Sequence, residues 1–142
     1  MTLFPYTTLF RSSQDAYVPR SRHPELVPVR CLLVDDSQTF LDAARGLLDR
    51  DGVAVAGTAS STAEALLQAS ALAPDVAVVD IGLGGENGFE LASRLASQDI
   101  TVIMTSTSAE ADFADLLADS PVAGFLPKAE LSAGGIRRVL GA

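Results

Sequence analysis

The stretch VRCLLVDDSQTFL, residues 29–41, joins an apolar run to a polar turn and then to a segment of helical spacing. The run from Val29 to Val34 has the length and the branched aliphatic composition of a buried strand. It ends on Asp35 and Asp36, whose like charges repel each other. A buried strand that ends on two adjacent carboxylates raises the question of what stabilises the pair.

Composition indicates a globular protein with one domain. The 142 residues are 48% hydrophobic and 20% charged, which suffices for one core of ordinary size. The net charge of −8 argues against direct binding of nucleic acid, whose phosphates are held by basic patches. The sequence contains neither a membrane-spanning run nor a signal peptide, so we expect a cytoplasmic protein. The single cysteine, Cys31, falls inside an apolar run and is expected to be a core residue.

Residues 1–28 differ in character from the rest of the chain. They contain four of the seven prolines and show neither helical periodicity nor alternation. We therefore expect a disordered leader, which also contains the only histidine, His23. Within it, TLFPYTTLFRS (residues 2–12) is similar to the conceptual translation of a sequencing adapter. That part is expected to be an artefact, with the true start of the protein downstream.

From Val29 onward, short apolar runs alternate with alanine- and leucine-rich stretches of helical spacing. The predicted strands are Val29–Val34, Val53–Ala59, Val76–Val79, Thr101–Thr105 and Ala123–Leu126. The predicted helices are Thr39–Asp49, Thr62–Leu72, Gly88–Ser97, Ala109–Asp119 and one from Leu131 to the end. Gly134 and Gly135 predict that this last helix is short or frayed at its start.

Strict alternation of five strands and five helices predicts an α/β fold with a doubly wound parallel sheet. Right-handed crossovers place helices on both faces of such a sheet. Because both faces are covered, the strands are expected to be apolar throughout instead of at every second residue.

Polar side chains follow four of the predicted strands, and in a doubly wound sheet ligands bind at these carboxyl ends. They are Asp35 and Asp36 after the first strand, Asp80 after the third, Thr105 and Ser106 after the fourth, and Lys128 after the fifth. Three crowded carboxylates favour a hard divalent cation such as Mg²⁺. Asp36 or Ser37 alternatively caps the following helix, but capping does not explain Asp80.

Four motifs occur in an order typical of one protein family: LLVDDS, VAVVDIGLGGENGFEL, TVIMTSTSA and GFLPKAEL. Asp80 lies 44 residues after Asp36. Lys128 lies 22 residues after Ser106. On these motifs, residues 29–142 resemble the receiver domain of two-component response regulators, the CheY-like domains. The resemblance implies a flavodoxin-like sheet with the strand order 2-1-3-4-5.

The resemblance assigns the acidic residues to phosphoryl transfer. It implies that Asp80 accepts a phosphoryl group from a histidine kinase or a phosphotransfer protein. Mg²⁺ would be held by Asp35, Asp36, Asp80 and the backbone carbonyl of Gly82. The roles agree with the chemistry, because phosphoryl transfer needs an aligned nucleophile and neutralised oxygens more than covalent help.

The resemblance also assigns the remaining polar positions and a switch. Ser106 would donate its hydroxyl to one phosphoryl oxygen, and Lys128 would pair with another. Thr105 is the neighbouring alternative to Ser106. Movement of Ser106 toward the phosphoryl group would vacate space for Phe125, the position of the family's aromatic switch residue, and so change a partner-binding face.

The partners implied are the kinase or phosphotransfer protein and an unknown downstream protein. A homodimer formed on phosphorylation is compatible with the resemblance, whereas direct contact with nucleic acid or a membrane is not expected. Such a domain is not an enzyme acting on other substrates, since it catalyses only its own phosphorylation and dephosphorylation.

The sequence departs from the family pattern at a few positions. Gly84 stands where the family usually has proline, and Gly82 lacks a side chain that would face the phosphate. Gly88, eight positions after Asp80, agrees with the pattern. The ending IRRVLGA is similar to that of stand-alone actinobacterial receivers, while GFLPKAELS resembles regulators that carry a helix-turn-helix, so loss of an output domain stays an alternative.

Other functions remain as alternatives at this point. A pseudo-receiver would use the same fold to bind proteins without taking phosphate. A Mg²⁺-dependent phosphatase of the haloacid dehalogenase type needs a second acid two residues after its nucleophile, where this chain has Gly82. A flavodoxin-like nucleotide-binding protein fits the fold, but Asp35 and Asp36 would repel a bare phosphate.

Overall fold

The computed structural model describes residues 29–141, so the predicted leader at residues 1–28 lies outside the described residues. Five parallel strands form one sheet in the order β2-β1-β3-β4-β5. The strands are β1 (Arg30–Val34), β2 (Ala54–Ala59), β3 (Val76–Asp80), β4 (Thr101–Ser106) and β5 (Gly124–Pro127). The predicted fold class and strand order are confirmed.

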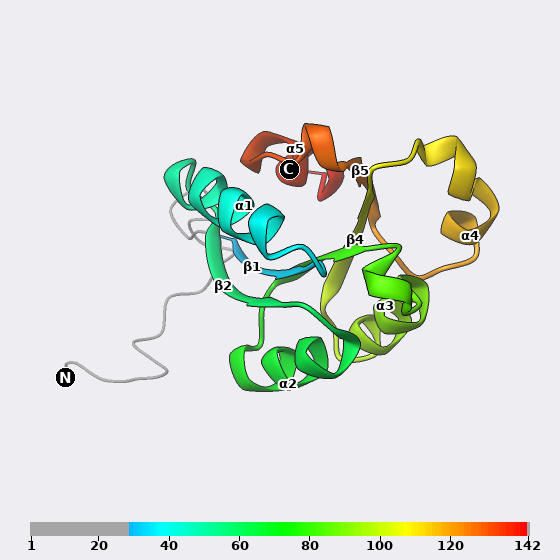
Figure 1. The fold of residues 1–142 in the computed structure, drawn as a ribbon, viewed down its shortest axis with the longest axis horizontal. Coiled ribbons are helices and arrows are strands. Elements are labelled where there is room, and N and C mark those ends of the chain that lie inside the picture. Colours follow the sequence, from blue (N-terminus) through cyan, green and yellow to red (C-terminus); the bar gives the residue numbers. More distant parts are fainter. Residues whose placement is uncertain (1–28, 142) are drawn as a thin grey trace.

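Helices cover both faces of the sheet (Figure 1). On one face lie α1 (Gln38–Arg50) and α5 (Ala133–Val139), and on the other α2 (Thr62–Leu72) and α3 (Gly88–Ala96). The short α4 (Ala114–Ala118) lies beyond α3, near β5. Among residues 29–141, no helix is long and apolar enough to cross a membrane.

The core has two layers because neighbouring residues of each central strand point to opposite faces. In β1, Leu32 and Val34 pack toward α2 and α3, whereas Cys31 and Leu33 pack toward α1 and α5. Every residue of β3 is buried, which explains the continuous apolar run Val76–Val79 that precedes Asp80.

Both faces of the sheet are covered as expected, but β2 is buried less completely than the central strands. Its burial alternates, with Val55, Gly57 and Ala59 buried and the intervening residues half-buried. The reason is its position, because β2 pairs only with β1 and forms an edge of the sheet. An edge strand is covered less completely than a central one.

Serine and asparagine caps set the starts of four helices. The side chains of Ser37, Ser61, Asn87 and Ser132 each accept a hydrogen bond from a backbone N–H in the first turn. The predicted bounds of α2 are the observed ones, since Ser61 marks its start. The last helix begins at Ala133 after the Ser132 cap and is short, as its glycines predict.

The helix predicted at Ala109–Asp119 is only partly correct. A 3₁₀ turn (Glu110–Phe113) precedes α4, whose five residues include no buried side chain. No side chain caps its start. The segment is rich in acidic residues and buries too little apolar surface to favour a longer helix.

Candidate functional site

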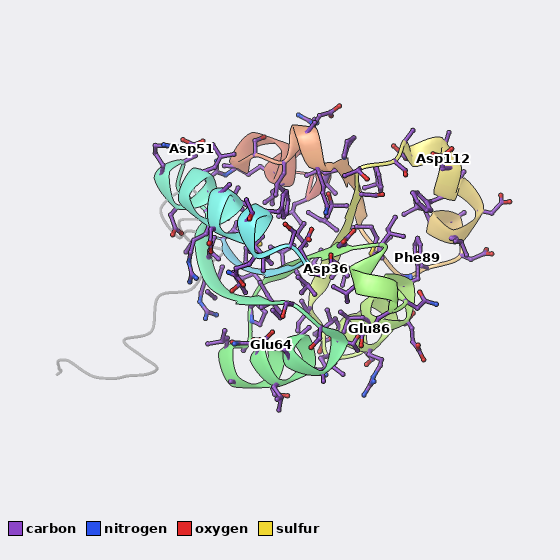
Figure 2. The ribbon with its side chains drawn as sticks, viewed as in Figure 1. Asp36, Asp51, Glu64, Glu86, Phe89 and Asp112 are labelled. Atoms are coloured by element: carbon purple, nitrogen blue, oxygen red, sulfur yellow. The ribbon has the colours of Figure 1, made fainter. Side chains whose placement is uncertain are left out.

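The carboxyl ends of the parallel strands meet at one edge of the sheet. Asp35 follows β1, while Asp80 and Ser106 are the last residues of β3 and β4. Lys128 follows β5, and Ser106 pairs in register with Pro127. Figure 2 shows Asp36 at this edge. The structure thus brings together the polar residues that the sequence placed after separate strands.

Three carboxylates form a cluster at this edge. One oxygen each of Asp35, Asp36 and Asp80 lies within 4.8 Å of the others. Asp35 and Asp80 are buried, at 1% and 7% exposure, whereas Asp36 is exposed. The cluster therefore combines two desolvated carboxylates with one that is open to solvent.

Lys128 neutralises part of this charge. Its Nζ lies 2.6 Å from Asp35 Oδ2 and 3.6 Å from Asp80 Oδ2. Burial alone would lower the pKa of Lys128, but the close contact with Asp35 and the charges of Asp35 and Asp80 outweigh it, and the pKa is raised. The ammonium also lies over the ring of Phe40, 4.8 Å from its centroid. The lysine is therefore held in its charged form between the two buried carboxylates.

The environment of Asp80 disfavours its ionised form. Burial, and next the charge of Asp35, raise the pKa of Asp80 above its ordinary value, although Lys128 opposes the change. The N–H of Gly82 donates a hydrogen bond to Asp80 Oδ1 at 3.2 Å. Any further cation at this carboxylate would offset the repulsion that Asp35 exerts.

The turn after β1 uses its residues in distinct ways. Asp35 Oδ1 accepts a hydrogen bond from the Ser37 N–H at 2.9 Å, and Ser37 Oγ accepts one from the Phe40 N–H at 3.2 Å. The capping alternative is therefore correct for Ser37. It does not account for Asp36, because no hydrogen bond from residues 29–141 reaches its carboxylate.

The two hydroxyl residues that end β4 lie in different places. Ser106 lines a pocket of about 410 Å³ together with Asp36, Asp80 and Lys128. Its Oγ accepts a hydrogen bond from the Ser108 N–H at 3.0 Å. Thr105 is absent from this lining, and its buried Oγ1 has no hydrogen-bond partner within the described part of the chain. Of the two residues, only Ser106 lines the pocket that contains Asp80.

The loop after Asp80 has a left-handed backbone. Leu83, Gly84 and Gly85 have φ angles of 23°, 59° and 90°. Proline cannot adopt the φ of Gly84, so this loop conformation excludes the residue that is usual in the family at this position. A Cβ at Gly84 would lie 3.3 Å from Asp36 Oδ2. The glycine therefore leaves room for the exposed carboxylate.

Hydrogen bonds hold this loop at both ends. The Gly82 carbonyl, one of the predicted metal ligands, accepts the Gly85 N–H at 2.9 Å. Glu86 lies beside the start of α2, where its Oε1 accepts the Thr62 N–H at 2.8 Å (Figure 2). This backbone hydrogen bond lowers the pKa of Glu86. The loop is thus tied to the start of α2.

Phe125, the predicted switch residue, is buried in β5 with 8% exposure. Its ring lies 6.5 Å from that of Phe113, centroid to centroid, at an interplanar angle of 35°. Both rings pack against the core layer that faces α2 and α3. In this conformation Phe125 is a core residue of β5, the strand that precedes Lys128.

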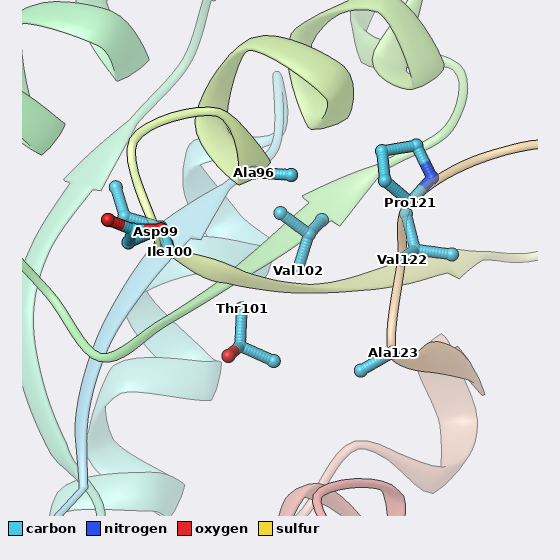
Figure 3. A pocket seen from close by; sticks show the side chains of 8 residues that line it. All are labelled: Ala96, Asp99, Ile100, Thr101, Val102, Pro121, Val122 and Ala123. Carbon is cyan, nitrogen blue, oxygen red and sulfur yellow. The ribbon is translucent and has the colours of Figure 1, made fainter.

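A second pocket lies at the opposite end of β4, away from the carboxylates (Figure 3). It is lined by small and apolar side chains, and Asp99 is the only ionisable residue in its lining. Its residues do not converge on a shared polar group.

The residues of the cluster fit a hard divalent cation. Carboxylate and carbonyl oxygens are the ligands that Mg²⁺ prefers, and three carboxylates converge here. Asp36 is free of protein hydrogen bonds from the described residues, and Asp80 is crowded by the charge of Asp35. A cation at these oxygens would relieve that crowding.

The fold and this arrangement define a class of protein, a flavodoxin-like domain with an acidic, lysine-containing pocket at the carboxyl ends of its strands. The family model described as the response regulator receiver domain matches residues 31–136. The chain therefore belongs to the response regulator receiver domain family, whose members are signalling switches of two-component systems.

Individual relatives agree with this assignment. Response regulator GacA of Pseudomonas viridiflava is 34% identical over 103 residues, covering 70% of this chain and 48% of GacA. The signal receiver domain of NarL from Mycobacterium tuberculosis has 27% identity and a TM-score of 0.69, over 81% of this chain and 98% of that one. The chain spans about half the length of the curated relatives that it matches.

A third relative was solved with a modified residue and bound groups. It is a response regulator from Burkholderia pseudomallei, solved with a phosphorylated aspartic acid, a calcium ion and citrate. It has 25% identity to this chain and a TM-score of 0.69, over 79% of this chain and 66% of that one.

Two contacts of the structure were not predicted from the sequence. Phe40 and Glu86 each meet a residue far away along the chain, Lys128 and Thr62. Helical spacing places Phe40 in the first turn of α1, but it does not reveal which side chain the ring contacts. No local signal identifies the partner of Glu86 either.

Proposed function

We propose that this receiver domain is a phosphoacceptor switch in which Asp80 takes a phosphoryl group from a histidine kinase or a phosphotransfer protein. The observation that carries the proposal is the position of the Asp80 carboxylate, which lies in an acidic cluster and 3.6 Å from the only lysine of the chain. The phosphorylated aspartic acid of the Burkholderia pseudomallei regulator supports it by analogy.

In the proposed reaction, an oxygen of Asp80 attacks phosphorus and forms the new O–P bond. The N–P bond of the phosphohistidine donor breaks, and its electron pair and a proton remain with the imidazole. Lys128 offsets negative charge on the transferred oxygens, and the Ser106 hydroxyl donates to one of them. The product is an aspartyl phosphate.

Asp36 and Asp80, with Asp35 and the Gly82 carbonyl, would hold Mg²⁺ at this site. The cation would supply charge neutralisation between the carboxylate and the anionic donor. Asp35 contributes in a second way, because its Oδ2 holds Lys128. The protein's own part is to keep the lysine charged and Asp80 accessible at the edge of the pocket.

The proposed output is a change at the face formed near β4, α4 and β5. Ser106 now accepts a hydrogen bond from Ser108, so its turn toward a phosphoryl group would break that bond. The β4–α4 segment is tied down weakly, since α4 has no buried residue. A movement of Ser106 would therefore pass into a segment that rearranges easily. The downstream partner, and a homodimer on phosphorylation, belong to this proposal.

Acetyl phosphate with Mg²⁺ and intact-protein mass spectrometry tests the phosphoacceptor role. We expect one phosphoryl adduct on the wild type, none on Asp80→Asn, and the same adduct on Asp99→Asn, an exposed carboxylate outside the cluster. Chelation of Mg²⁺ should abolish the adduct. Absence of the adduct on the wild type would favour a pseudo-receiver, and an equal adduct on Asp80→Asn would exclude Asp80 as the acceptor.

A further inference from the structure

Phe40 lies in the first turn of α1, directly after the acidic turn. The Ser37 cap fixes this turn by accepting the Phe40 N–H at 3.2 Å. The ring is half-buried, and the Lys128 Nζ lies 4.8 Å from its centroid. This distance is within the range of about 6 Å in which an ammonium is attracted to an aromatic face.

The surroundings of Lys128 make this contact consequential. The side chain is only 17% exposed, and its Nζ lies 2.6 Å from Asp35 Oδ2. Electrostatic contacts are stronger where water is excluded, so the aromatic face acts on a desolvated cation. A lysine on a flexible four-carbon stem otherwise has many rotamers. Asp35 and Phe40 restrict them from two sides.

We infer that Phe40 is a positioning residue that, together with Asp35, holds the Lys128 ammonium beside Asp80 before the phosphodonor arrives. The inference rests on the proposed function. Phe40 does not touch the reacting atoms and acts only through the lysine. Ser37 caps α1 and donates its N–H to Asp35, and Phe40 lies in the first turn of the same helix. One local structure therefore positions both groups that hold the lysine.

The first test observes the lysine directly. Lys128 is the only lysine in the chain, so protein labelled with ¹³C-lysine gives a single side-chain Cε–Hε signal. The ring current of Phe40 should shift this signal upfield, and Phe40→Leu should remove the shift while Phe40→Tyr keeps it. Phe89→Leu is the matched control, because Phe89 lies in the first turn of α3 and packs against the other core layer.

The second test measures the initial rate of phosphorylation by acetyl phosphate with Mg²⁺. Loss of the ring contact in Phe40→Leu should slow the reaction about fivefold, which corresponds to one cation–π contact of ordinary strength. Phe40→Tyr should restore most of the rate, and Phe89→Leu should react like the wild type. Phe40→Met, which is also apolar and lacks a ring, replaces Phe40→Leu if the latter does not fold.

The outcomes separate this inference from the proposed function. If the Lys128 signal stays in place in Phe40→Leu, or if the wild type, Phe40→Leu and Phe40→Tyr react at one rate, the inference is overturned while Asp80 remains the acceptor. Equal slowing of Phe40→Tyr and Phe40→Leu also overturns it. A wild type that takes no phosphoryl group overturns the proposed function, and this inference with it.

Discussion

Asp35 and Asp36 are neighbours in the chain but differ in environment. Asp35 is buried, and its two oxygens meet the Ser37 N–H and the Lys128 ammonium. Asp36 is exposed and accepts no hydrogen bond from the described residues. Their repulsion is thus relieved in separate ways, by an ion pair for one and by water for the other. Removal of Lys128 alone would leave the buried Asp35 carboxylate without a counter-charge. The free-energy cost of that state is larger than the net stabilisation that the intact ion pair provides.

Cys31 is the residue whose chemistry the fold suppresses most strongly. It is fully buried in β1, and burial raises its pKa from 9.0 to about 12. We expect the native thiol to resist iodoacetamide at pH 8, because both access and thiolate are lacking. The unfolded protein in guanidinium should react at the rate of a free thiol. Mass spectrometry reads the result without ambiguity, since the chain has one cysteine.

The raised pKa of Cys31 also makes the stability of the fold depend on pH. The folded state retains the Cys31 proton to about pH 12, whereas the unfolded thiol loses it near pH 9.0. The stabilisation is therefore complete below pH 9 and decreases as the pH rises toward 12. Rapid alkylation of the native protein at pH 8, at the rate seen in guanidinium, would contradict the burial of the Cys31 thiol and, with it, this dependence of stability on pH.

At the scale of elements, caps and close contacts set the geometry of the site. Ser37 begins α1 directly after the acidic pair, and Asn87 begins α3 after the loop that follows Asp80. The sequence predicts these starts well, because the cap residues are local signals. It predicts the 3₁₀ turn before α4 poorly, since alanine and leucine spacing there indicated a longer helix than the exposed segment sustains.

Gly88 is a position where α3 approaches the end of β3 closely. A Cβ there would collide with the Asp80 carbonyl oxygen and lie 2.9 Å from Ile81 Cα. Because both are backbone atoms, Gly88→Ala should lower the free energy of unfolding by about 2 kcal/mol or more. Urea denaturation measures the change.

Gly46 provides the matched control for this substitution. It lies within α1, and a Cβ there would meet no atom within 4 Å. Gly46→Ala should therefore raise the free energy of unfolding by about 0.5–1 kcal/mol, the usual gain from alanine in a helix. Equal effects of the two substitutions would show that the close contact at residue 88 is unimportant.

At the scale of the whole molecule, the topology made most of the site predictable. Parallel strands joined by helical crossovers have their carboxyl ends at the same edge of the sheet, so Asp80, Ser106 and Lys128 meet although they are distant in sequence. Contacts that depend on side-chain rotamers, such as Phe40 with Lys128, leave no comparable pattern. The closeness of Gly84 to Asp36, where a Cβ would lie 3.3 Å from Oδ2, likewise has no local sequence signal.

The distribution of charge leads to a prediction about stability. Three carboxylates and one ammonium share the site, in a chain whose net charge is −8. A cation that binds only the native state stabilises it in proportion to the logarithm of its excess over the dissociation constant. Millimolar MgCl₂ should therefore raise the Tm more than NaCl of equal ionic strength, as measured by differential scanning calorimetry.

Substitution of single carboxylates separates site binding from general screening. Asp36→Asn should remove most of the Mg²⁺-specific increase in Tm, because Asp36 is the carboxylate of the cluster that is free to bind. Without Mg²⁺ the same variant should be as stable as the wild type or slightly more so, since one repulsion is lost. Asp112→Asn, an exposed carboxylate in the 3₁₀ turn before α4 (Figure 2), should keep the full increase. If Asp36→Asn and Asp112→Asn respond alike to MgCl₂, the cation acts by screening and the acidic cluster does not bind it.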